Sequence, residues 1–131
     1  MLLTGGCHCA RVRFEVEVPE TVNVSECNCS VCTKAGFLGV IVPTAQFQLQ
    51  SGTEALKTYT FNTGTAQHHF CVHCGIKSFY VPRSHPDGIS VNFRCLDETA
   101  GLSINRDTFD GQEWENQLPS GRADGYPNSV G

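Results

Sequence analysis

Three features of the sequence predict an all-β protein. Short segments of β-branched and aromatic residues recur along the chain, several of them alternate between apolar and polar positions, and Gly, Pro or Asn separates them. Helical signals are weak and confined to the end, around residues 111–118. We therefore expect a sandwich or barrel of short antiparallel strands.

The clearest strand is expected at residues 11–18, where every second residue from Val12 to Val18 is apolar and Pro19 ends the pattern. A continuous apolar run at residues 37–42, stopped by Pro43, is typical of a central strand. A cysteine-rich loop is expected between these two strands. Further strands are expected at residues 47–52, 56–63, 67–70, 78–81 and 89–93.

The 131-residue chain has the length of one domain, which we expect to occupy residues 1–118. Residues 119–131 offer little to bury and are expected to form a loosely ordered tail. A hydrophobic content of 40% and a charged content of 17% are typical of a compact globular protein.

Composition also limits the partners and the compartment. A net charge of −4 without a basic face disfavours nucleic acid as a partner. The first residues lack the pattern of a signal peptide, and no apolar stretch approaches the ~20 residues that a membrane span needs. We expect a cytoplasmic protein that uses its eight cysteines as metal ligands or catalytic thiols rather than in disulfides.

The most informative segment holds three cysteines within six residues, Cys27, Cys29 and Cys32. Three thiolates on one tight loop can close around a single ion from three sides. Tetrahedral zinc takes four ligands, and catalytic zinc sites use three protein ligands and keep the fourth position open. The triplet therefore predicts a zinc site with one position left for another residue, water or substrate.

Two cysteine pairs accompany the triplet. Cys7 and Cys9 follow Gly5-Gly6, and Cys71 and Cys74 precede Gly75, which permits a tight turn. A redox dithiol is the alternative for either pair, but no strand–helix setting of the thioredoxin type is evident. We favour one zinc site built from both pairs, since this grouping uses every motif.

A second grouping stays open, in which Cys7 and Cys9 complete the site of the triplet and Cys71 and Cys74 lack further ligands. The eighth cysteine, Cys95, has three interpretations: a fourth ligand of the triplet, a nucleophile activated by Arg94, or a small buried residue. The buried role is favoured because free cysteine is among the most buried residue types. Histidines are interpreted as core, surface or turn residues rather than ligands.

The combined motifs resemble the glutathione-dependent formaldehyde-activating enzyme family. The resemblance covers roughly residues 5–118 and rests on the segments at residues 5–9, 27–34 and 70–79. Residues 58–63, 80–84 and 95–98 resemble its centromere protein V branch in particular. One departure is Ala10, where members commonly carry Gly.

The resemblance implies a zinc-containing β-tent fold and a carbon–sulfur lyase that forms or cleaves an S-hydroxymethyl adduct of glutathione with formaldehyde or another small aldehyde. It implies a structural zinc at Cys7, Cys9, Cys71 and Cys74. It also implies an exchangeable zinc at Cys27, Cys29 and Cys32, where the glutathione thiol becomes the fourth ligand. Proximity to the motifs makes three cations candidates for binding the glutathione carboxylates: Lys34, Arg83 and Arg94.

Two other functions compete with the lyase. One is a thiol oxidoreductase, similar to the zinc-bearing methionine sulfoxide reductases, that uses Cys95 as its nucleophile. The other is a binding module without catalysis, although the acidic composition argues against a chromatin role. Family analogy alone suggests a homodimer.

Overall fold

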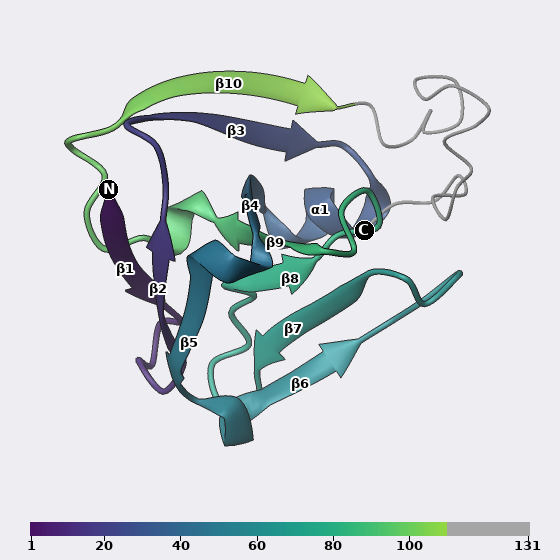
Figure 1. Ribbon diagram of the computed structural model, residues 1–131. Helices are drawn as coiled ribbons and strands as arrows, with labels where there is room; N and C mark the ends of the chain where they lie inside the picture. The colour runs from purple at the N-terminus through teal and green to yellow at the C-terminus, as the bar shows by residue number, and fades with distance from the viewer. Residues whose placement is uncertain (110–131) are drawn as a thin grey trace.

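The computed structural model describes residues 1–109, which form two β-sheets with short helices between the strands (Figure 1). The smaller sheet has the strand order β1-β2-β5, and both of its pairs are antiparallel. Its strands are β1 (Leu2–Gly6), β2 (Arg13–Glu17) and β5 (Phe47–Ser51).

The larger sheet has the strand order β10-β3-β4-β9-β8-β7-β6. Its strand pairs are antiparallel, apart from β10, which runs parallel to β3. The fold is therefore all-β, as predicted, with one parallel pair in a mainly antiparallel sheet. The strands are β3 (Thr21–Cys27), β4 (Leu38–Pro43), β6 (Leu56–Tyr59), β7 (Gln67–Cys71), β8 (Phe79–Val81), β9 (Gly88–Asn92) and β10 (Ser103–Phe109).

Helices occur in short pieces: α1 (Ser30–Ala35), η1 (Thr44–Gln46), η2 (Thr53–Ala55) and η3 (Phe93–Cys95). The first of them corrects the expectation that helical segments lie only near the end of the chain and that the cysteine triplet lies wholly on a loop. Six residues are too few to produce a helical periodicity in the sequence. The expected helix at 111–118 and the tail at 119–131 lie outside the described residues. Within residues 1–109, no helix is both long and apolar enough to cross a membrane.

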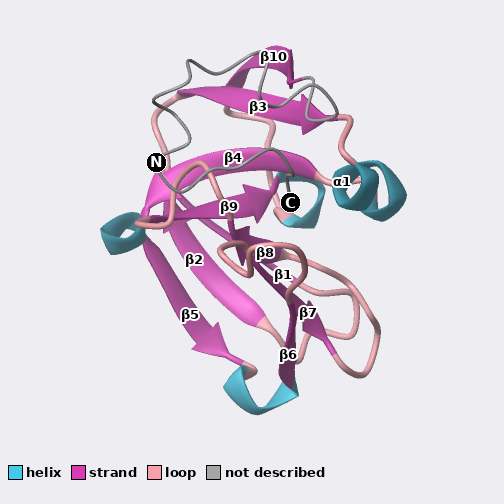
Figure 2. Ribbon diagram, turned by 90° about the vertical axis from the view of Figure 1, so that its right-hand side faces the viewer, coloured by secondary structure: helices cyan, strands magenta, loops and turns pink. Residues whose placement is uncertain are grey.

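Buried residues from strands of both sheets form one hydrophobic core, and three aromatic rings join the two sheets, whose arrangement is also seen in Figure 2. Phe14 of β2 and Phe47 of β5 belong to the small sheet, and Phe79 of β8 belongs to the large one. The ring centroids are 5.3 Å apart for Phe14 and Phe47, 4.7 Å for Phe47 and Phe79, and 6.3 Å for Phe14 and Phe79. Tilted and edge-on pairs at these distances add to the stabilisation from burial alone.

The backbone of β1 approaches this core so closely that Gly5 has no room for a side chain. A Cβ atom there would lie 2.5 Å from the carbonyl oxygen of Cys95 and 2.7 Å from Cζ of Phe14. We therefore expect a Gly5→Ala substitution to lower the free energy of unfolding by about 1–3 kcal/mol, since neither neighbour can move freely. Urea denaturation measures the effect.

The matched control is Gly101→Ala. A Cβ atom at position 101 would meet Cε of Met1 at 2.7 Å, the end of a flexible and exposed side chain. We expect a change below about 0.5 kcal/mol in this variant. Equal effects of the two substitutions would contradict the close approach of β1 to the core.

Candidate metal centres

The cysteine triplet lies where β3 ends and α1 begins. Cys27 is the last residue of β3, and Cys29 is the N-cap of α1, with its Sγ atom accepting a hydrogen bond from the backbone nitrogen of Cys32 at 3.3 Å. Gly36 ends the helix with a φ of 64°, a left-handed conformation that glycine adopts without strain. This strand–turn–helix brings the three sulfur atoms within 4.8 Å of one another.

A second group of thiols joins the two sheets. Cys7 and Cys9 follow β1 of the small sheet, and Cys71 ends β7 of the large sheet with Cys74 in the next turn. Their four sulfur atoms all lie within 4.8 Å of one another. The structure thus brings the two pairs together and leaves the triplet separate, at α1 and away from the ends of β1 and β7 (Figure 1).

Backbone groups orient the sulfurs of the four-cysteine set. The backbone nitrogens of Val12 and His73 donate hydrogen bonds to Cys7 Sγ and Cys71 Sγ, each at 3.4 Å. The turn after Cys9 places Ala10 at a φ of 67°. Glycine adopts this left-handed conformation without strain, whereas the Cβ atom of alanine makes it less favourable, so the residue type at position 10 affects the turn.

The sulfur spacing fits a tetrahedral metal ion. Zinc holds each sulfur at ~2.3 Å, which places two ligand sulfurs about 3.8 Å apart. The Cys7–Cys9 and Cys9–Cys71 sulfur distances are both 3.6 Å, and all eight cysteines are free thiols. Disulfide sulfurs would be ~2.05 Å apart. The four-cysteine set can therefore close a coordination shell, while the triplet provides three of four ligands.

The three thiols of the triplet differ in their pKa values. Hydrogen bonds from Cys27 and Cys32 lower the pKa of Cys29 to about 3. Hydrogen bonding to Cys29 raises the pKa of Cys27 to about 11, and bonds to both neighbours raise the pKa of Cys32 further. One thiolate is thus present at neutral pH, and the other two thiols are expected to lose their protons as an ion binds.

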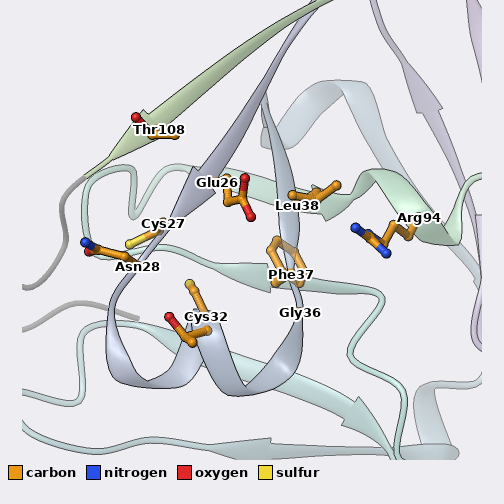
Figure 3. A pocket seen from close by; sticks show the side chains of 10 residues that line it. Glu26, Cys27, Asn28, Cys32, Gly36, Phe37, Leu38, Arg94 and Thr108 are labelled. Carbon is orange, nitrogen blue, oxygen red and sulfur yellow. The ribbon is translucent and has the colours of Figure 1, made fainter.

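A cavity of about 410 Å³ opens beside the triplet. Figure 3 shows the sulfurs of Cys27 and Cys32 at one end of this cavity, with Phe37 in its middle and Arg94 of η3 at the other end. Glu26 and Thr108 also line it. Its volume lies within the range of small-molecule sites, which is ~300–1,000 Å³.

The three predicted carboxylate-binding cations lie in different surroundings. Arg94 lines the cavity of the triplet. Lys34 is exposed on α1 and is not among the residues that line this cavity. Arg83 is buried just after β8, and its burial lowers its pKa.

Three residues near the triplet, Lys77, Tyr80 and His68, were not predicted from the sequence as part of a site. Burial raises the pKa of Tyr80, and the nearby Cys32, Cys27 and Cys29 add to this effect, so Tyr80 lies close to the triplet. Lys77 lies close enough for the same three thiols to act on its charge. His68, interpreted as a core or surface residue, is buried and stacks on Tyr80 with a centroid distance of 4.9 Å. His68 and Tyr80 come together because they are paired across β7 and β8, and this pairing is not evident from the sequence.

Cys95 lies apart from the triplet. It ends η3, is partly buried, and belongs to neither group of clustered thiols among residues 1–109. Burial raises the pKa of its thiol to about 11, with smaller contributions from Cys7 and Cys74. Cys95 is therefore protonated at neutral pH, which argues against its use as a nucleophile.

Comparison with known proteins agrees with this architecture. The family profile described as glutathione-dependent formaldehyde-activating enzyme matches residues 2–112. A Halomonas elongata protein provisionally named a glutathione-dependent formaldehyde-activating enzyme is 33% identical over 82 residues, which are 56% of this chain and 52% of that protein. The matched segment thus spans about half the length of this curated relative.

A crystal structure of a Rhodobacter sphaeroides protein has a similar fold. It superposes with a TM-score of 0.67 and 29% sequence identity, covering 79% of this chain and 100% of that one. The match of the family profile extends over both cysteine groups. The chain therefore belongs to the glutathione-dependent formaldehyde-activating enzyme family.

Proposed function

We propose that this chain is a zinc-dependent carbon–sulfur lyase that forms or cleaves the S-hydroxymethyl adduct of glutathione with formaldehyde or another small aldehyde. Family membership supports the reaction class. The observation that carries the proposal is an incomplete ligand set at a cavity: three clustered thiols, two of which line a space of about 410 Å³.

The two thiol groups have different tasks in this proposal. Cys7, Cys9, Cys71 and Cys74 hold a structural zinc with no open position, and Cys27, Cys29 and Cys32 hold a second, exchangeable zinc from three sides. Zinc in the second site supplies the charge that keeps an incoming thiol deprotonated near neutral pH. The cavity then places the aldehyde carbon next to that sulfur, so that positioning accounts for much of the rate.

The reaction balances without an oxidant or reductant. In the forward direction, the glutathione sulfur forms a bond to the carbonyl carbon, and the carbonyl oxygen takes up a proton in place of the one that the thiol lost. In reverse, the carbon–sulfur bond breaks and the thiol regains its proton. The buried side chain of Tyr80 lies close to Cys32 and helps to hold this side of the site in place in both directions of the reaction.

The test of this function is the rate at which formaldehyde exchanges between its free form and its glutathione adduct. Exchange spectroscopy with ¹³C-labelled formaldehyde measures this rate against the spontaneous reaction. We expect the protein to accelerate exchange, and expect the acceleration to disappear when a chelator removes the metal. A rate equal to the spontaneous one with fully metal-loaded protein would contradict the proposal.

Among the three cations proposed for the glutathione carboxylates, Arg94 is the one that lines the cavity. We expect Arg94→Ala to weaken glutathione binding about fivefold, the equivalent of about 1 kcal/mol for a solvent-accessible ion pair. Lys34→Ala removes an exposed cation outside the cavity lining and should change the affinity less than about twofold. Calorimetric titration of glutathione into the metal-loaded variants compares the two, and a larger effect at Lys34 would reverse the assignment.

Finer assignments are part of the same proposal. The resemblance of residues 58–63, 80–84 and 95–98 supports assignment of the chain to the centromere protein V-like branch of the family. Eight free cysteines fit a reducing cytoplasm. Family analogy supports a homodimer, which sedimentation analysis can test.

A further inference from the structure

Lys77 is a partly buried lysine enclosed by three rings. Its Nζ atom donates a hydrogen bond to Nδ1 of His68 at 2.7 Å and lies 3.9 Å from the ring centroid of Tyr80 and 4.8 Å from that of Phe37. Among residues 1–109, none of the ion pairs with a carboxylate involves this lysine. Its charge is therefore held in place by aromatic faces and a histidine rather than by an acid.

The enclosing rings place this charge at the triplet. Phe37 lines the same cavity as Cys27 and Cys32, and Tyr80 lies close enough to the three thiols for them to affect its pKa. Burial lowers the pKa of Lys77 to about 8, and the Coulombic influence of Cys32, Cys29 and Cys27 in their thiolate forms opposes this lowering. The three thiols are thus the acidic groups that act most strongly on Lys77.

The contact with Lys77 requires one protonation state of His68. Because the ammonium of Lys77 donates to Nδ1, His68 must be neutral and carry its proton on Nε2. Burial, with a further contribution from Lys77, lowers the pKa of His68 to about 3. The histidine therefore stays an acceptor at neutral pH and acts as a positioning residue for the ammonium.

A cation at this place has a defined use if the triplet holds a divalent ion. Three thiolates and one such ion carry a net charge of −1. A thiolate as fourth ligand makes the charge −2, whereas a neutral ligand leaves it at −1. The second negative charge is costly in a partly buried site unless a positive charge lies nearby.

We propose that Lys77 stabilises an anionic sulfur as the fourth ligand at the triplet and so makes the open position selective for thiolates over neutral ligands. This inference rests on the proposed function and deepens it, because it names the feature of the ligand that the site recognises. It needs neither carboxylate of glutathione. The selectivity therefore extends to small uncharged thiols, which bind as thiolates and release their proton to solvent.

The test uses the full chain loaded with cobalt(II) and two probes, 2-mercaptoethanol and imidazole, at one fixed pH near neutrality. The four-cysteine set has no open position, so a change in the cobalt absorption on adding either probe reports the triplet. We expect Lys77→Met to weaken 2-mercaptoethanol binding about tenfold, the loss of one nearby charge discounted for partial exposure. Imidazole binding should change less than about twofold, and Lys77→Arg should restore most of the thiol affinity.

Lys34→Met is the matched control, since it removes the same charge from an exposed lysine two residues after Cys32. Its thiol affinity should stay within about twofold of the unaltered chain. An equal loss in Lys34→Met would assign the effect to net charge and overturn the inference. Unchanged thiol binding in Lys77→Met would also overturn the inference, as would a loss of imidazole binding in this variant equal to its loss of thiol binding. Each of these results would leave the proposed function intact.

Two further outcomes separate the inference from folding and from the proposed function. If Lys77→Met and Lys77→Gln both fail to take up cobalt at the triplet while Lys77→Arg loads normally, Lys77 supports the three-thiolate site itself, and selectivity for the fourth ligand is overturned. If the unaltered cobalt protein shows no response to 2-mercaptoethanol or glutathione, the proposed function fails and the inference with it.

Discussion

A Cys71→Ser variant is expected to lose its cooperative unfolding transition together with one metal ion per chain. Cys71 is fully buried at the end of β7 and belongs to the set that joins this strand to the end of β1, so an ion bound there would tie the two sheets together. Structural zinc contributes an apparent ~10–16 kcal/mol in small zinc domains. This contribution is comparable to the whole net stability of a typical domain, which is ~5–15 kcal/mol. Thermal unfolding followed by circular dichroism, with zinc determination, measures both losses.

The control for this variant is Cys95→Ser. Cys95 is partly buried and lies outside both thiol groups, so its replacement should cost no more than about 1–2 kcal/mol and leave the zinc content unchanged. A Cys71→Ser protein that keeps its full zinc content and melting temperature would show that the four-cysteine set is not a structural metal site.

A Cys29→Ser variant is expected to stay folded but lose the metal of the triplet and with it thiol binding. Serine is among the best N-cap residues, so its hydroxyl can accept the bond from the Cys32 nitrogen and preserve α1. The substitution therefore changes the ligand with little effect on the local backbone. We expect the acceleration of formaldehyde exchange to fall by more than the ~100-fold that changes around metal ligands can cost.

Three measurements on the Cys29→Ser protein check this expectation: its zinc content, its melting temperature and its affinity for glutathione. The melting temperature should stay near that of the unaltered chain, since the four-cysteine set is complete in this variant. Glutathione binding retained at full strength would show that the triplet does not receive the thiol, whatever the zinc content.

The sequence predicts those parts of the fold that local patterns encode. Alternation in residues 11–18 corresponds to β2, and the apolar run at 37–42 corresponds to β4, which lies inside the large sheet between β3 and β9. The parallel pairing of β10 with β3 was not predictable, because the paired segments Ser103–Phe109 and Thr21–Cys27 are far apart in the sequence and neither carries a pairing signal. The short helix α1 has only its two caps, Cys29 and Gly36, as local signals.

The clustering of the thiols was predictable from spacing, but their surroundings were not. Close motifs such as Cys27-x-Cys29 limit where the sulfurs can point, so few arrangements were open. The roles of His68, Tyr80 and Lys77 depend on the register between β7 and β8 and on a turn that brings the lysine back towards α1. Spacing in the sequence carries no information on such a register.

The proposed function requires two separate metal sites, one closed and one open. Zinc per chain, determined by elemental analysis of anaerobically purified protein against amino-acid quantitation, tests for both sites. We expect two zinc ions per chain in the unaltered protein, held by Cys7, Cys9, Cys71 and Cys74 and by Cys27, Cys29 and Cys32. One zinc per chain after full reduction and saturation with the metal would contradict this expectation, because the triplet would then have no ion to present a thiol.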